Sequence, residues 1–292
     1  QVDKNASNLR RQRSSTIALL LFEDPTSDDS LVNPFFLAML GSITKACAAK
    51  SYDLLVSFQN LDNNWQAEYE DSHKADGLIL LGYGDYRSYA GKLSQLHQHN
   101  THVMRWGAPV EQWPGISIGC DNFSGGQSVT RHLLSHDYRS FAFIGDIGDK
   151  APEFQSRYDG FLSALDKHHT HHQYDAISSE EAGIEAAKHL LETTSALPDA
   201  IVCAADIIAV GVLQQLKEAG IRVPEDVAVV GFDNIQLAAF TTPGLTTVQQ
   251  NTAQAGEKLV ENLLLAIDGH PTDDHLLPTN LVVRQSCGCD IK

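Results

Sequence analysis

Residues 201–248 constrain the fold more than any other part of the chain. A short apolar run at the start of this segment is followed by a helical repeat of small and apolar residues, and then by the near-continuous apolar run 227–232. Asp206 can cap the helix and Gly220 can end it. A strand that is apolar on both faces is typical of a parallel sheet covered by helices on both sides. The segment therefore predicts a strand–helix–strand unit, and Asp233, which follows the second run, lies where such sheets bind ligands.

Apolar runs separated by helical patterns occur in two successive rounds along the chain. Such alternation predicts parallel sheets with covering helices, and its repetition predicts two similar α/β lobes with a boundary near residues 115–122. A further helix, 253–267, and a last strand, 277–283, follow the second round. The predicted strands begin near Thr16, Asp53, Asp76 and Thr101 in the first round, and near Ser140, Tyr174, Asp199 and Asp226 in the second.

Composition narrows the possible functions. A chain of 292 residues with 42% hydrophobic content can build two cores, and a formal charge of −16 argues against nucleic-acid binding over the whole surface. The exception is residues 1–13, which hold four basic residues and one acidic residue. No apolar run reaches the roughly 20 residues of a membrane span, and residues 1–13 do not read as a signal peptide, so we expect a cytoplasmic protein without a membrane partner.

Metal and disulfide chemistry receive little support from the sequence. The five cysteines are odd in number and scattered, which does not indicate a disulfide framework. Cys287 and Cys289 could bind a metal or form a redox pair, but zinc spacing normally has at least two intervening residues, so we favour an incidental pair of thiols. The histidine tract 168–172 is predicted to be a solvated connection, and the alternative is a metal site, because imidazoles bind zinc or nickel. We expect neither a metal nor a cofactor.

Catalysis is also not expected. The chain has no Gly-x-Ser-x-Gly elbow and no phosphate loop. Residues 82–87 fail as a dinucleotide fingerprint because Arg87 occupies the place of the third glycine.

Four segments carry a family resemblance. Residues 206–211, 219–227, 229–234 and 243–248 resemble the effector-binding region of the lactose/galactose repressor family of bacterial transcription regulators, and the similarity extends from the N-terminus through residues 277–284. The resemblance implies a periplasmic-binding-protein-like fold of two lobes joined by three crossover segments around a cleft. We accordingly expect a hinge segment at 1–13, an N-terminal lobe at 14–119 plus 249–276, and a C-terminal lobe at 120–248 plus 277–292.

Three aromatic residues are candidates for the effector pocket. Phe35 and Phe36 follow a helix start at Asn33 and Pro34, and in the family an aromatic pair at the matching place lines the pocket. The alternative is that both are core residues beneath the helix. Trp106 resembles a family tryptophan beside the pocket and a lobe crossover. Aromatic faces of this kind can stack on a sugar ring or a base.

Charged residues complete the candidate pocket. Arg157 is followed three residues later by a glycine, as is the family's effector-bonding arginine, and Glu153 lies one helical turn earlier. The alternative for Arg157 is a surface ion pair with Asp159 or Asp166. The charged effector contacts that the resemblance implies are Glu153, Arg157, Asp206 and Asp233.

Three departures from the family pattern leave the effector's identity open. Ala205 replaces a ligand-bonding asparagine of many sugar-responsive members, Ser178 falls where an aromatic ring often closes the pocket, and Arg105 falls where several members have an aspartate. The remaining residues fit a ring-shaped polyol, a sugar or a sugar phosphate.

The basic N-terminal segment resembles the family's hinge helix. Ala6, Leu9 and Arg10 match positions at which that helix meets the minor groove of operator DNA, with the leucine as a wedge between base steps. On its own so short a helix is expected to be frayed. The resemblance therefore implies an effector-binding and dimerisation core that reaches DNA through this hinge and a preceding DNA-binding headpiece. The alternative is a sugar-binding protein of a transport system, which shares the architecture.

Overall fold

A computed structural model describes residues 13–22, 33–59, 69, 72–82, 91, 93–96, 98, 101–109, 115–148 and 151–289. The chain divides into two compact units. Unit 1 comprises Gln1–Val32, Phe36–Cys120 and Asn251–Leu277, and unit 2 comprises Asn33–Phe35, Asp121–Gln250 and Pro278–Lys292. Each unit contains one six-stranded sheet, so the predicted class of two helix-covered, parallel-dominated sheets is confirmed.

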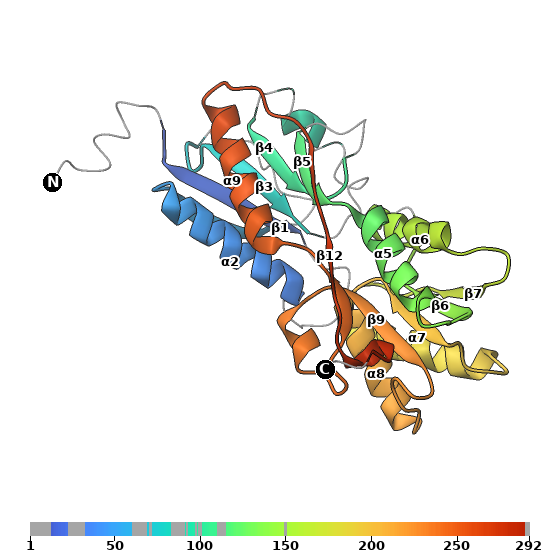
Figure 1. The fold of residues 1–292 in the computed structure, drawn as a ribbon. Helices are drawn as coiled ribbons and strands as arrows, with labels where there is room; N and C mark the ends of the chain where they lie inside the picture. Colours follow the sequence, from blue (N-terminus) through green and yellow to red (C-terminus); the bar gives the residue numbers. More distant parts are fainter. Residues whose placement is uncertain are drawn as a thin grey trace. The chain divides into compact units, whose positions relative to one another are not determined.

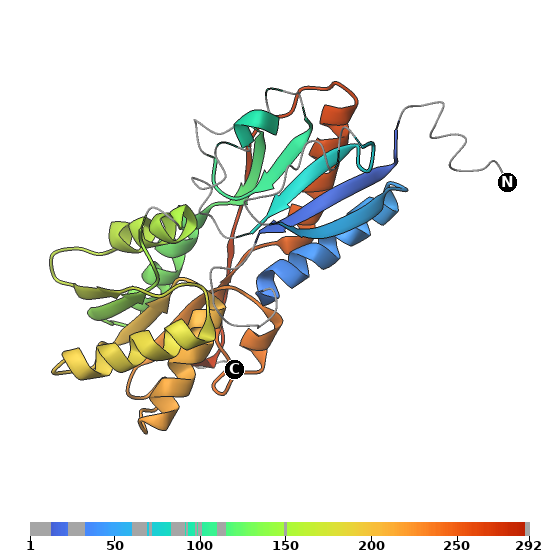
Figure 2. The same ribbon diagram turned by 180° about the vertical axis from the view of Figure 1, so that it is seen from behind.

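Unit 1 is built on a fully parallel sheet (Figure 1). The apolar runs of its central strands are fully buried, with Ile17, Leu19 and Leu80 at 0% exposure, which explains why these strands read as continuous apolar segments. Helices α2 (Pro34–Ala49) and α9 (Thr252–Ile267) lie side by side on one face of the sheet (Figures 1 and 2). The strand order is β11 (His275–Leu277), β5 (Ile116–Cys120), β4 (Val103–Trp106), β3 (Gly77–Leu81), β1 (Thr16–Phe22) and β2 (Asp53–Gln59).

Unit 2 has the same architecture with one antiparallel edge (Figure 1). Helices α5 (Asn122–Leu134) and α6 (Pro152–Ala164) pack together on one face of its sheet, and α7 (Glu180–Thr193) and α8 (Asp206–Glu218) pack together on the other. The strand order is β12 (Asn280–Val282), β10 (Thr246–Gln249), β9 (Ala228–Asp233), β8 (Ala200–Cys203), β6 (Ser140–Ile144) and β7 (Thr170–Tyr174). All neighbouring strands in this order pair in parallel, except that β12 pairs antiparallel with β10.

The last predicted strand, 277–283, is wrong in its extent. Two short strands replace it: β11 pairs in parallel with β5 in the sheet of unit 1, and β12 pairs antiparallel with β10 in the sheet of unit 2. Pro278 lies between them and has no N–H to donate to a ladder, so it interrupts the apolar run where the chain passes from one unit to the other.

Two further local predictions are corrected by the structure. The tract 168–172 is not a loop throughout, because His171 and His172 lie in the edge strand β7, where exposed polar side chains are tolerated. Asp206 does not cap α8 with its side chain: Ala205 is the N-cap residue and Asp206 is the first residue of the helix. Short 3₁₀ helices follow at Gln236–Ala239 and Gln285–Cys287. Over the described residues, every helix is too short or too polar to cross a membrane.

Candidate functional site

Polar side chains gather at the carboxyl ends of neighbouring strands in unit 2. Asp233 is the last residue of β9, and Gln250 directly follows the last residue of β10, the parallel neighbour of β9. Gln250 Nε2 donates a 2.6 Å hydrogen bond to Asp233 Oδ1. Asp233 and Asn234 have φ angles of +118° and +54°, which side-chain-bearing residues rarely adopt. Backbone strain of this kind is found preferentially at ligand sites.

Arg157 reaches the same place from α6. Its Nε donates to Asn122 Oδ1 at 2.8 Å, its Nη1 donates to the carbonyl oxygen of Ala204, and Nη1 lies 3.5 Å from Asp233 Oδ1. The guanidinium carbon lies 3.8 Å from the centre of the Phe232 ring, a cation–π arrangement. Because Arg157 is only 5% exposed, the alternative of a surface ion pair does not describe it. The predicted pair Arg157 and Asp233 is therefore brought together at the strand ends.

A close approach of two helices holds Arg157 in position. A Cβ atom at Gly160 would lie 2.1 Å from the carbonyl oxygen of Phe123, and one at Gly126 would lie 2.1 Å from the carbonyl oxygen of Arg157 itself. Helices α5 and α6 therefore meet backbone to backbone, which places the Arg157 side chain against Asn122 at the start of α5. Packing thus explains the glycine at position 160, because Gly160 and Arg157 both lie on the face of α6 that meets α5.

The carboxyl group of Asp233 is electrostatically unusual. Burial raises its pKa to about 6, and the positive charge of Arg157 and the hydrogen bond from Gln250 oppose that rise. Its Oδ2 atom accepts no hydrogen bond from the described residues, and neither does Arg157 Nη2 donate one to them. One acceptor and one donor at the strand ends are therefore available to a ligand.

Asp206 binds the protein next to this edge of the sheet. It is fully buried, Oδ1 accepts from the Thr247 hydroxyl at 2.5 Å, and Oδ2 accepts from the Ile235 N–H at 2.8 Å. Burial and the nearby negative charge of Asp233 raise the pKa of Asp206 well above its usual value, against the effect of these hydrogen bonds. One oxygen thus binds the backbone two residues after Asp233 and the other binds β10, so in this structure Asp206 has a structural role; a direct effector contact stays a prediction.

The remaining predicted residues occupy other elements. Phe35 and Phe36 lie in the first turn of α2 and are 6% and 7% exposed, and Trp106 is the last residue of β4 at 6% exposure. Glu153 lies half-buried in the first turn of α6. Their effector contacts stay predictions. The hinge residues Ala6, Leu9 and Arg10 fall outside the described residues.

Sequence reasoning missed three polar residues of the site. Gln250 directly follows β10, so the strand-end rule that singled out Asp233 could have found it. Asn122 is the first residue of α5 and follows a strand of the other sheet, so this rule does not place it at the site. Arg284 lies after β12, donates through Nη2 to Asn234 Oδ1 at 2.7 Å and through Nη1 to the carbonyl oxygen of Leu245 at 2.6 Å. It could not be found by this rule, because it approaches from the end of the chain.

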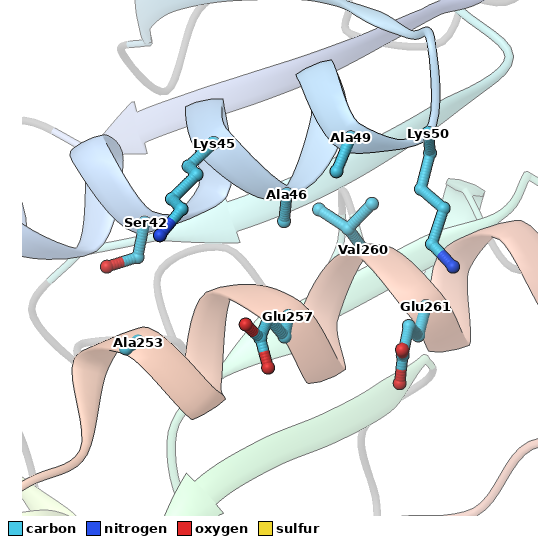
Figure 3. A pocket seen from close by; sticks show the side chains of 9 residues that line it. All are labelled: Ser42, Lys45, Ala46, Ala49, Lys50, Ala253, Glu257, Val260 and Glu261. Atoms are coloured by element: carbon cyan, nitrogen blue, oxygen red, sulfur yellow. The ribbon is translucent and has the colours of Figure 1, made fainter.

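A separate groove lies between α2 and α9 in unit 1 (Figure 3). It has a volume of about 370 Å³, and Lys45 of α2 and Lys50, which directly follows α2, face Glu257 and Glu261 of α9 across it. Its lining contains none of the predicted effector residues. Its mixed charges give no convergent donor and acceptor pair like that at Arg157 and Asp233, so we place the candidate site at the strand ends of unit 2.

Known proteins match both the sequence and this fold. Residues 130–287 match the family of periplasmic binding protein-like domains, and because they make up more than half of the chain, the chain belongs to that family. The HTH-type transcriptional repressor PurR of Pectobacterium atrosepticum is 28% identical over 290 residues, which cover 96% of this chain and 82% of the relative.

Two further matches are informative. The ribose operon repressor of Haemophilus influenzae is 28% identical over 295 residues, covering 96% of this chain and 83% of the relative. The crystal structure of a LacI family transcriptional regulator from Enterococcus faecium with bound ribose has a TM-score of 0.78 at 22% identity, covering 93% of this chain and 98% of that chain. The predicted resemblance to the lactose/galactose repressor family is thereby confirmed.

Proposed function

We propose that this chain is the effector-binding core of a DNA-binding transcription regulator, and that Arg157 and Asp233 bind hydroxyl groups of its effector. The observation that carries the proposal is the pairing of an available donor, Arg157 Nη2, with an available acceptor, Asp233 Oδ2, at buried strand ends. Adjacent hydroxyls of a polyol can donate to the carboxylate and accept from the guanidinium. Hydrogen bonds to charged groups of this kind contribute about 1.5–3 kcal/mol each.

The relatives support a sugar or a sugar phosphate as the effector class. One relative is named a ribose operon repressor, and the Enterococcus faecium regulator of the same fold holds ribose. PurR is an equally similar relative, so the site chemistry rather than the ranking of relatives carries this choice. Stacking of the ring on Phe35, Phe36 or Trp106 is part of the proposal.

Regulation would follow if effector binding changes the affinity of the regulator for DNA. In this proposal the chain forms a homodimer, and the effector shifts the population of conformations that order the hinge segment around Leu9 on operator DNA in the cytoplasm. That the relatives are repressors favours a regulator over the alternative of a sugar-binding protein for transport, and over an enzyme.

The test begins with a thermal-shift screen over sugars and sugar phosphates, followed by calorimetry with the compound that stabilises the chain. Arg157→Ala and Asp233→Ala should each weaken binding by about 1.5–3 kcal/mol, or roughly tenfold to a hundredfold. Arg222→Ala is the matched control, because Arg222 forms an exposed ion pair with Asp226. Unchanged affinity in both site variants would show that the effector binds elsewhere.

A further inference from the structure

Four metal-ligating side chains converge at the end of α5 in unit 2. His132 lies in the last turn of α5 and His136 in the turn after it, four residues on, while Cys287 and Cys289 flank Gly288 near the end of the chain. His132 Nε2 lies 3.4 Å from Cys287 Sγ and 3.3 Å from Cys289 Sγ. Cys289 Sγ lies 3.1 Å from His136 Nε2 and 2.9 Å from Cys287 Sγ. Neither cysteine forms a disulfide.

These separations resemble the edges of a tetrahedral metal site. The ligand atoms of His132, Cys287 and Cys289 all lie within 4.8 Å of one another. With Zn–S bonds of about 2.3 Å and Zn–N bonds of about 2.0–2.1 Å, a tetrahedron has S···N edges of about 3.6 Å and an S···S edge of about 3.8 Å. Each separation given above lies within about 1 Å of these values, so small side-chain rotations would seat an ion on His132, Cys287 and Cys289. His136 lies 3.1 Å from Cys289 Sγ but outside this mutually close set, so its side chain must turn further to become the fourth ligand.

The backbone next to the cysteines is also suited to the cluster. Gly288 adopts φ +82°, and a Cβ atom there would lie 2.6 Å from the Tyr138 hydroxyl oxygen. That hydroxyl donates to the carbonyl oxygen of Cys287 at 3.2 Å. The Cys287–Gly288–Cys289 turn is thus seated directly against the end of α5.

We propose that His132, His136, Cys287 and Cys289 form a structural zinc site that clips the C-terminal segment onto α5. Four protein ligands close the coordination sphere, which is typical of structural rather than catalytic zinc. The sequence alone favoured an incidental pair of thiols, because zinc ligands normally have at least two intervening residues. The fold adds His132 and His136, which lie four residues apart at the end of α5; His132 is 155 residues from Cys287 in the sequence.

The clipped segment carries contacts that reach the candidate effector site. Ser286 Oγ donates to the carbonyl oxygen of Val229 and accepts from the Thr246 N–H, which ties the segment to β9 and β10. Arg284, three residues before Cys287, bonds Asn234, the neighbour of Asp233. Zinc would therefore stabilise the segment that binds β9, β10 and Asn234, without contacting the effector.

The test uses the whole chain, purified with a reductant and then freed of metal. After addition of zinc and gel filtration, a colorimetric chelator should release about one zinc per chain, and cobalt(II) in its place should give the intense visible absorption of a tetrahedral site. Cys289→Ser and His132→Gln should each weaken zinc binding at least a hundredfold. His172→Gln, in the exposed tract of β7, is the matched control and should bind as the parent does.

A second readout separates metal binding from misfolding. Without metal, the parent and Cys289→Ser should show the same circular dichroism and the same melting temperature, and zinc should raise the melting temperature of the parent alone. Three results would overturn the proposal. They are equal zinc binding by Cys289→Ser, loss of zinc in His172→Gln, and failure of the fully reduced parent chain to bind zinc.

Discussion

Replacement of Gly160 by alanine should destabilise unit 2 although alanine is the better helix former. A Cβ atom at this position would lie 2.1 Å from the carbonyl oxygen of Phe123 and 2.9 Å from the Gln127 N atom, whereas real Cβ contacts are longer than 3.0 Å. The obstacle is helix backbone, which cannot rotate away as a side chain can. Helices α5 and α6 must therefore separate by nearly 1 Å to admit the methyl group.

The magnitude follows from two opposing terms. Overpacking of a close interface costs about 1–3 kcal/mol, while the change from glycine to alanine in a helix contributes about 1 kcal/mol in favour of folding. The expected net loss is up to about 2 kcal/mol in the free energy of unfolding, or a melting temperature lower by up to about 8 °C. Because the shift of α6 carries Arg157 away from Asn122, effector affinity should also fall.

Urea unfolding followed by circular dichroism measures the first effect, and calorimetry with the effector measures the second. Gly41→Ala is the matched control, because Gly41 lies exposed in α2 with no atom within 4 Å of an added Cβ, and it should stabilise the chain by up to about 1 kcal/mol. If the two units unfold separately, Gly160→Ala should move only the transition of unit 2. A Gly160→Ala variant as stable as Gly41→Ala would refute the packing argument.

Two other predictions concern the buried carboxylates. Burial raises the pKa of Asp233 to about 6 from 3.8, so the folded chain binds this proton at a higher pH than the unfolded chain does. Protonation of Asp233 therefore stabilises the folded chain at low pH, and this contribution to the free energy of unfolding declines as pH rises from about 4 to 6 and is constant above. Effector affinity, which in the proposal needs the carboxylate, should fall about tenfold between pH 7 and pH 5. Calorimetry on Asp233→Asn should show weak effector affinity that does not change with pH. If the affinity of this variant changes with pH as that of the parent does, the titration belongs to another group. Thr247→Val removes the hydroxyl that donates to buried Asp206, and in urea unfolding it should lower the free energy of unfolding by about 1–3 kcal/mol. The control Thr44→Val, on the exposed face of α2, should change it by less than about 0.5 kcal/mol. Equal effects would contradict a structural role for Asp206.

The sequence predicted the buried strands well and the edges of the sheets poorly. The run that ends in Asp233 lies at the centre of its sheet, so apolar residues on both faces were an unambiguous signal. Strand β7 was misplaced: its start was expected near Tyr174, where it ends, because it is an edge strand with exposed His171 and His172 and has no apolar alternation to detect. The apolar run around Pro278 was assigned to one strand because periodicity shows that a segment is extended but not which sheet it joins.

The candidate site was predictable where a residue has a positional rule and unpredictable where it depends on long-range packing. Asp233 has such a rule, since it ends a central strand. For Arg157 the spacing to Gly160 indicated the family pattern, but only the fold shows that this glycine admits the backbone of α5. Asn122 resembled an ordinary helix start, and nothing in the sequence links it to an arginine 35 residues away.

The two buried aspartates explain why this edge of unit 2 can respond to a ligand. Asp206 has both oxygens bonded by the protein, whereas Asp233 has one oxygen with no partner among the described residues and a pKa raised to about 6. A ligand hydroxyl that donates to that oxygen lowers the free energy of the charged form, so effector binding and proton release at Asp233 must be linked. The strained backbone at Asp233 and Asn234 lies in the same segment, held by Arg284. In the proposed site, the free energy of effector binding is therefore applied where a buried carboxylate and a strained backbone lie together.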